Sequence, residues 1–181
     1  MSRASQPFTP LRDLEARRRW SGPAIAGVLT QDLAEFCQSG VSVILAARSA
    51  RGLAIAGLAL ACRITSEGRM RILLRGPANG PILAALDADS PIAVTFSEPC
   101  THRSIQVKAP RAARADVEAG DTEEIERQGR SFGEQLIRIG YTPRFADHYR
   151  AYRRDEIVAL EFLPTDAFVQ TPGPGAGEQL A

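Results

Sequence analysis

The sequence is poor in the residues that hold metals and disulfides. Its 181 residues include three cysteines and two histidines. Cys37, Cys62 and Cys100 are odd in number and scattered, without the close pairs typical of disulfide frameworks or zinc sites. His102 and His148 have no carboxylate or cysteine at ligand-like spacing. We therefore expect no metal site and a cytoplasmic protein whose reduced cysteines serve as small apolar core residues.

An excess of one charge is also missing. The 22 basic and 21 acidic residues leave a net charge of +1, so the whole molecule is not attracted to nucleic acid or an anionic membrane. No apolar stretch reaches the roughly 20 residues that a membrane-spanning helix needs. The run "RRRW" before "SGPAIAGVL" resembles the start of a secretion signal, but Asp32 and Glu35 follow before any cleavage region. We expect neither nucleic acid nor membrane as a partner.

The composition is that of one globular domain. Hydrophobic residues make up 44% of the chain and charged residues 24%, and the length suits a single core. Residues 1–23, rich in Arg, Ser and Pro, are expected to form an N-terminal extension that wraps or frays. Residues 24–165 then form the domain. Residues 166–181 form a Pro/Gly-rich tail that is either a flexible end or a stiffened strand end lying over a partner subunit or a cleft.

Apolar runs with β-branched residues or strict alternation predict a mainly β protein. Tight turns separate the strands that we expect at residues 41–47, 53–65, 70–75, 91–96, 102–109 and 156–164, with a further one in "RAARADV". Gly57, inside the long second strand, predicts a bulge or a close backbone approach. Because few strands are separated by helices, this order favours a closed barrel over a doubly wound sheet.

Helix signals interrupt the strands at four places. Thr30 is the expected N-cap of a helix that ends at Gly40. A short helix begins at Pro81, with Asn79 or Gly80 as its N-cap. A longer one runs from Asp121, which resembles a capping box with Glu124, to Gly140, and a shorter one follows Pro143. The last two form a helical insertion before the last predicted strand.

The block from about Val41 to Ala109 resembles the pyridoxamine 5'-phosphate oxidase-like FMN-binding split barrels. The resemblance covers about two thirds of the chain, and its specific segments are the hairpin "VSVILAARSARGLAIAGLALACRIT", "RMRILLR", "PILAALDADSP", "IAVTF", "THRSIQVKA" and the closing "LEFLPTDAFVQTPGPGAG". It implies a mainly β split barrel of the FMN-binding type with peripheral helices. It also implies a homodimer that binds FMN, or else F420 or haem, in clefts between the two subunits.

The resemblance also assigns positions to the cofactor site. The family's basic strand motif falls near "LACRIT", which makes Arg63 a candidate phosphate partner. Its Ser-Arg-Lys turn falls at Asn79 and Gly80, where Arg and Lys are absent. Its Arg-Gln pair falls on Arg103 and Ser104, so a hydroxyl replaces the amide that reaches the flavin, unless Gln106 serves.

A flavin mononucleotide needs an anion site for its phosphate. Backbone N–H groups at the start of the helix that begins at Pro81 point outward with the positive end of the helix dipole, and Arg75 or Arg63 adds a full charge. Asn79 and Gly80 belong to the same turn. The alternative interpretation is a tight connection from strand to helix with an exposed arginine.

The flavin ring needs an apolar slot with a few polar groups. Thr101, Ser104 and Gln106 supply such groups, and the last two share one strand face because they are two residues apart. Polar side chains of this kind are also common on the solvent face of a barrel strand. Both interpretations stay open.

Two classes of function follow. The first is an FMN-dependent oxidoreductase acting on an unidentified small molecule, in which the flavin carries the electron chemistry. The second is a non-catalytic flavin-binding, haem-binding or sensor protein on the same dimeric fold, where haem would use His148 as its axial ligand. A third hypothesis keeps the fold and the dimer without a cofactor. The sequence leaves open whether the protein is an enzyme.

Overall fold

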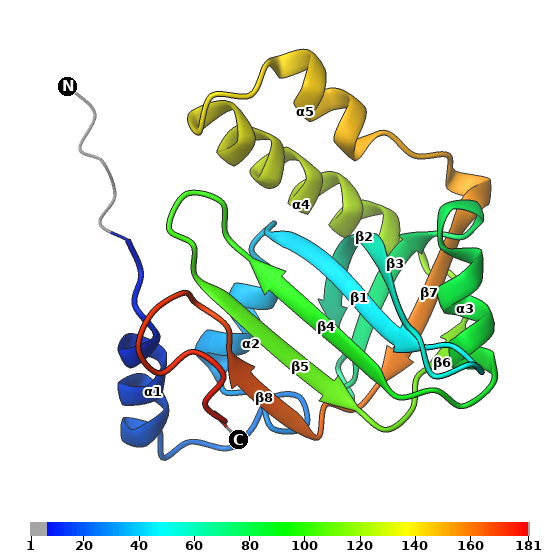
Figure 1. Ribbon diagram of the computed structural model, residues 1–181. Helices are drawn as coiled ribbons and strands as arrows, with labels where there is room; N and C mark the ends of the chain where they lie inside the picture. The colour runs from blue at the N-terminus through cyan, green and yellow to red at the C-terminus, as the bar shows by residue number, and fades with distance from the viewer. Residues whose placement is uncertain (1–6, 181) are drawn as a thin grey trace.

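The strands form a single curled sheet, as expected. The computed structural model describes residues 7–180. Its antiparallel sheet has the strand order β6-β7-β3-β2-β1-β4-β5-β8 (Figure 1). The strands are β1 (Ser42–Arg48), β2 (Ala54–Ile64), β3 (Met70–Arg75), β4 (Ile92–Ser97), β5 (Ser104–Ala109), β6 (Ala113–Ala115), β7 (Ile157–Phe162) and β8 (Asp166–Val169). The prediction of a mainly β split barrel with peripheral helices is confirmed.

The helices surround this sheet. They are α1 (Pro10–Arg19), α2 (Gln31–Cys37), α3 (Gly80–Asp87), α4 (Ala119–Arg138) and α5 (Pro143–Arg150), with 3-10 turns at Pro77–Asn79 and Arg154–Glu156. Thr30 caps α2 by accepting a hydrogen bond from the Leu33 N–H, as the sequence predicts. Asn79 is the N-cap residue of α3, also as predicted.

Strand β2 changes partner along its length. Its first half pairs with β1 from Ala54 to Leu58, and its second half pairs with β3 from Ala59 to Ile64. The register shifts between Ala59 and Ala61, so the bulge lies beyond Gly57 rather than at it. Because β3 ends at Arg75, the first half of β2 has one edge without a neighbouring strand, and the turn before α3 lies against that edge.

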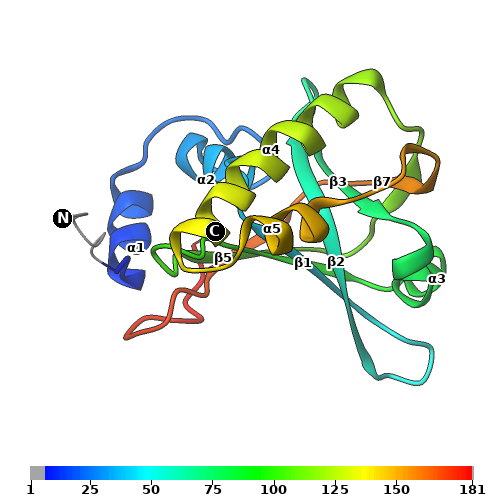
Figure 2. The same ribbon diagram turned by 90° about the horizontal axis from the view of Figure 1, so that it is seen from above.

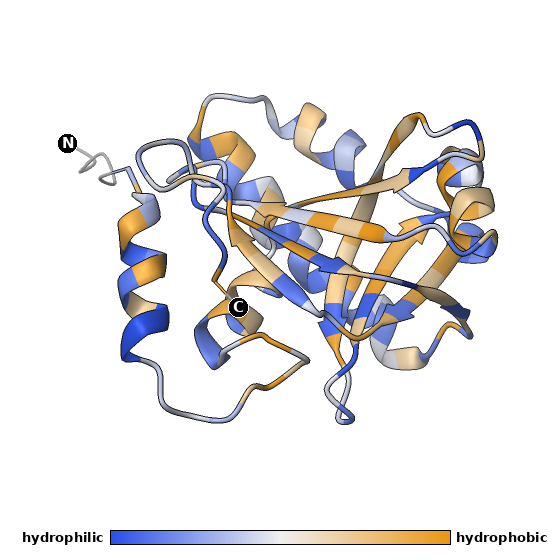
Figure 3. Ribbon diagram, turned by 60° about the horizontal axis from the view of Figure 1, so that its bottom comes forward, coloured by the Kyte–Doolittle hydropathy of each residue, from blue (hydrophilic) through white to orange (hydrophobic). Residues whose placement is uncertain are grey.

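The hydrophobic core has two parts. The larger part lies inside the barrel, where Ile82 and Leu86 of α3 join side chains from the strands. The smaller part lies on the outer face of β2, β3 and β7, where Ile125 of α4 packs against Ala61 and Leu73. Figure 2 shows α4 crossing this side of the sheet with α5 beside it. The central strands are mainly hydrophobic, whereas α1 alternates hydrophilic and hydrophobic residues (Figure 3).

The outer face of β1, β4, β5 and β8 is different, because none of the described helices covers it (Figure 1). Ile44 is 39% exposed and Leu58 41% exposed, and the two are cross-strand partners. We call this surface the open face. Within residues 7–180, no helix is both long enough and apolar enough to span a membrane.

The described parts of both chain ends, residues 7–23 and 166–180, are more ordered than the sequence suggests. Residues 10–19 form a helix whose Leu14 reaches the main core, although no core element is predicted there. The described part of the tail also packs against the domain. Leu180 is buried, its N–H donates to the Ala167 oxygen, and the Gly177 N–H donates to the Val169 oxygen. Apolar contacts this sparse leave no periodic signal in a sequence.

Three local predictions are corrected. The capping box of α4 joins Glu118 and Asp121 rather than Asp121 and Glu124, because the helix begins two residues earlier than predicted. Strand β5 begins at Ser104, since His102 has a φ of 62° in the preceding turn. Finally, β7 is not the last strand, because β8 follows it and pairs with β5.

Candidate functional site

Asn79 fastens the start of α3 to the free edge of β2. It is 3% exposed, and its Nδ2 donates to the Leu58 oxygen at 3.1 Å and to the Arg75 oxygen at 2.8 Å. Two carbonyl acceptors require the NH₂ group at this position, so the amide orientation is determined by its neighbours. Its Oδ1 is buried without a hydrogen-bond partner. The Asn79 amide therefore holds the connection between β3 and α3.

Gly57 is required by this arrangement. A Cβ at Gly57 would lie 2.1 Å from Oδ1 of Asn79, closer than any side chain tolerates. The predicted close approach is confirmed, with the Asn79 side chain as the group that approaches. The Asn79 side chain thus joins β2 to the start of α3, about 20 residues later in the chain, at a point beside the open face.

Arg75 and Gly80 lie on either side of Asn79 in the sequence. Gly80 is exposed, and a Cβ there would meet no atom within 4 Å. Arg75 ends β3, its Nη1 donates to the Ala151 oxygen at 3.0 Å, and its Nε is buried without a hydrogen-bond partner. The 3-10 turn Pro77–Asn79 runs directly into the start of α3, which lies near an arginine with an unused donor.

Gln106 lies at the other end of a continuous row on the open face. Cross-strand pairing joins Leu58 to Ile44, Ile44 to Thr95, and Thr95 to Gln106. The Gln106 Nε2 donates to Oγ1 of Thr95 at 3.0 Å. Since neighbouring strands are about 4.8 Å apart, the row spans about 14 Å. It leads from Leu58, whose backbone oxygen accepts from Asn79, to Gln106. We call these four residues, Leu58, Ile44, Thr95 and Gln106, the central row.

Thr101 and Ser104 are occupied within the hairpin that joins β4 and β5. Thr101 donates to the Glu98 carboxylate and accepts from the Arg103 N–H. Ser104 is buried, its hydroxyl lies 2.6 Å from that of Ser97, and its N–H donates to Oγ1 of Thr171. These groups hold the turn and the C-terminal segment together. Ser104 shares a strand face with Gln106, as predicted, but its hydroxyl is already engaged by Ser97 and the Phe96 oxygen.

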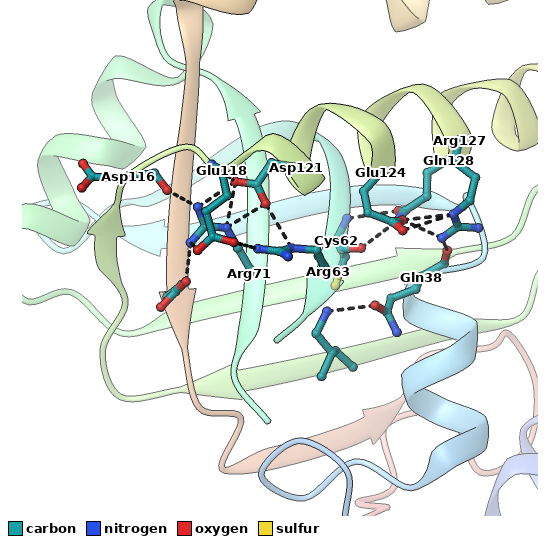
Figure 4. Close-up of polar contacts among 12 residues, drawn as sticks. Gln38, Cys62, Arg63, Arg71, Asp116, Glu118, Asp121, Glu124, Arg127 and Gln128 are labelled. Atoms are coloured by element: carbon teal, nitrogen blue, oxygen red, sulfur yellow. Dashed lines mark hydrogen bonds and ion pairs between the residues drawn. The ribbon is translucent and has the colours of Figure 1, made fainter. Parts of the chain in front are cut away.

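Arg63 faces carboxylates. Its side chain pairs with Glu118, and its Nε lies 3.1 Å from Oδ1 of Asp121. The neighbouring Arg71 is 1% exposed and donates to Asp121, Glu161 and the Asp116 oxygen (Figure 4). Burial alone would lower the pKa of Arg71, but its hydrogen bonds to Asp121 and Glu161 outweigh burial and leave that pKa raised. Carboxylates of this chain thus engage both arginines.

Arg103 is also engaged. Its guanidinium donates to Oδ1 of Asp13 at 2.6 Å, pairs with Asp32, and stacks over Phe36 with 4.3 Å between Cζ and the ring centroid. Asp13 is 3% exposed, and burial raises the pKa of its carboxyl although Arg103 opposes that shift. Arg103 thereby joins α1, α2 and the start of β5.

The remaining candidates are the cysteines and His148. Cys37 and Cys62 are buried, and burial raises the pKa of both thiols, which disfavours the reactive thiolate. His148 is exposed on α5. Among residues 7–180 no group of three or more His, Cys, Asp or Glu side chains is placed to hold a metal ion.

The structure therefore divides the predicted site residues. It brings Arg75, Asn79 and Gly80 together at the start of α3, and it links them through the central row to Gln106. Arg63, Thr101 and Ser104 have other neighbours. Sequence reasoning missed Ile44, Leu58 and Thr95, because only the strand register shows that they share one row.

Comparison with known proteins supports the fold. No protein-family model and no curated protein matches the chain. Among solved structures, HupZ of Group A Streptococcus aligns with a TM-score of 0.50 at 11% identity, covering 83% of this chain and 98% of HupZ. Another structure aligns with a TM-score of 0.51 at 12% identity, over 96% of this chain and 93% of the other.

Two further structures are similar at lower scores. A candidate pyridoxamine 5'-phosphate oxidase from Lactobacillus delbrueckii has a TM-score of 0.48 at 13% identity, covering 77% of this chain and 93% of that one. The haem storage protein HutZ from Vibrio cholerae has a TM-score of 0.47 at 16% identity, covering 76% of this chain and 92% of HutZ. At sequence identities this low, the alignments show similarity of fold alone. By its fold, this chain is a pyridoxamine 5'-phosphate oxidase-like split barrel.

Proposed function

We propose that the protein is a homodimeric FMN-binding protein that catalyses a redox reaction on a small molecule. The observation that carries the proposal is the central row, which connects the start of α3 and Arg75 to a polar pair along an uncovered sheet. A flavin mononucleotide has this distribution, with its phosphate at one end and its polar ring edge at the other. Proteins similar in fold include HutZ, described as a haem storage protein, and an F420 reductase.

The residues present are compatible with the two ends of a flavin. The phosphate end would lie at the start of α3, with Gly80 allowing close approach and the Arg75 guanidinium as a charged donor. The ring would lie over Ile44 and Leu58, with the Thr95–Gln106 pair at its polar edge. When bound, FMN supplies the hydride and electron chemistry. The protein binds, orients and excludes water.

The same face supports the dimer. Ile44 and Leu58 are exposed apolar side chains in the middle of an uncovered sheet, and such a patch marks an interaction surface. A second copy packed there would shield both side chains and close the cleft over the ring. Each cofactor would then contact two subunits.

We expect the purified protein to be a yellow dimer. Its absorption spectrum should show flavin bands that bleach on reduction, the released cofactor should be FMN by mass spectrometry, and native mass spectrometry should give two chains with two FMN molecules. A Soret band would indicate haem instead. Colourless protein whose melting temperature and added FMN fluorescence both stay unchanged on titration contradicts the proposal.

Replacing Arg75 with Ala should weaken FMN binding by about tenfold or more, because a charged hydrogen bond to phosphate contributes about 1.5–3 kcal/mol. Riboflavin, which lacks the phosphate, should bind the variant and the wild type equally. Arg63→Ala is the matched control, since Arg63 already pairs with Glu118 and Asp121. Fluorescence titration measures all three affinities. Equal FMN affinity in the Arg75 variant and the wild type would place the phosphate elsewhere.

A further inference from the structure

A hollow lies on the open face, beside the central row. Its volume is about 350 Å³, within the range of pockets that hold small molecules. It is lined by Ala46, Ala47, Arg48, Gly52, Ala54, Pro91, Ile92, Ala93, Lys108 and Ala109. These residues come from β1, β2, β4 and β5 and from the turns that join them. No residue of this pocket belongs to the sites described above.

The hollow exists because short side chains meet across the sheet. Ala46 is the cross-strand partner of Ala93, and Ala93 is the partner of Lys108. Alanine is uncommon in strands, where larger β-branched and aromatic residues normally fill the surface. Five alanines among the ten lining residues leave an apolar floor without bulk.

Two cations border this apolar floor. The Arg48 and Lys108 side chains are both exposed, and neither forms a hydrogen bond or an ion pair with any residue in the part of the chain described, 7–180. The Lys108 ammonium lies 4.3 Å from the centroid of the Phe168 ring. Asp166 is the cross-strand partner of Lys108, but its carboxylate oxygens accept from Thr165 and Gln179. Other exposed arginines, for example Arg111 and Arg114, are paired with carboxylates.

The position of the pocket relates it to the cofactor. Ala46 and Ala93 are each two residues from a member of the central row, Ile44 and Thr95, on the same strands and the same face. Two residues along a strand correspond to about 7 Å. A molecule held in the pocket would therefore lie beside a ring held over the central row.

We propose that this pocket binds the small-molecule substrate and that the substrate is an organic anion with a compact apolar body. The alanine floor takes the apolar body, while Arg48 and Lys108 hold the carboxylate or phosphate group. The role as substrate site rests on the proposed function, whereas the binding of an organic anion does not depend on a flavin.

The test compares two probes of the same shape, 2-naphthoate and the neutral 2-naphthalenemethanol, on the purified protein in its native assembly. We expect 2-naphthoate to bind more tightly and to weaken as ionic strength rises. Arg48→Ala and Lys108→Ala should each weaken 2-naphthoate by about two- to fivefold, the range of exposed ion pairs, without affecting the neutral probe. Arg51→Ala, in the turn that follows Arg48 but outside the pocket lining, is the matched control.

A larger side chain on the apolar floor of the pocket provides a second test. Ala93→Leu should abolish binding of both probes, because the leucine side chain occupies the hollow. Equal affinity for the two probes, or no effect of either cation variant, would overturn the proposal. Loss of bound FMN in the Arg48 variant would also overturn it, by assigning the pocket to the cofactor. Selective 2-naphthoate binding by a protein that binds no flavin would reject the proposed function and leave the anion pocket standing.

Discussion

Replacing Arg71 with Met should lower the free energy of unfolding by about 3–5 kcal/mol, the cost of leaving buried charge without its partner. Arg71 is 1% exposed, and Asp121 is fully buried beside it. The guanidinium donates to both oxygens of Asp121, to Glu161 and to the Asp116 oxygen. Methionine keeps much of the volume but supplies no donor. Urea denaturation, with the midpoint and slope compared, measures the loss.

The control for this prediction removes both sides of the pair. Asp121→Asn in the Arg71→Met background should recover part of the loss, because a neutral amide costs less to bury than an unpaired carboxylate. Two single variants that are each as stable as the wild type would show that the cluster contributes nothing. Strictly additive effects in the double variant would show that the two side chains do not interact.

Most of the fold could be predicted from the sequence, because the signals for strands, turns and helix caps are local. Alternating apolar residues, tight turns and the Thr30 cap each act within a few residues, and they place most of the strands and helices correctly. The ends of the chain gave no such signal. Leu14 and Leu180 are buried by distant parts of the chain, and neither belongs to a periodic apolar pattern.

The site could be predicted only in part, because contacts between distant parts of the chain leave no local signal in the sequence. The turn containing Asn79 could be recognised as a helix start, but the sequence does not show that its amide is consumed by the Leu58 and Arg75 carbonyls. The engagement of Arg63 depends on Asp121, more than fifty residues away along the chain. Gly57 was the exception, because a glycine inside a strand already indicates a close approach.

Replacing Arg103 with Ala should release α1 from the barrel and destabilise the protein by about 3–5 kcal/mol, through an unpaired buried Asp13. The variant also loses the stacking of Arg103 on Phe36 and Phe8. Limited proteolysis should then cleave between α1 and α2 in the variant and not in the wild type. Denaturant unfolding measures the global loss.

The pH dependence distinguishes a charge effect from lost packing. Burial raises the pKa of Asp13, so the folded state binds a proton more readily than the unfolded state does. The stability attributable to this carboxyl is therefore greatest below the unfolded pKa of about 3.9 and falls as pH rises through the folded value. Removing Arg103 removes the charge that opposes this shift, so the loss in the variant should be smaller at acid pH than at neutral pH. Asp13→Asn combined with Arg103→Ala should abolish that difference, and a loss independent of pH would attribute the effect of Arg103 to packing alone.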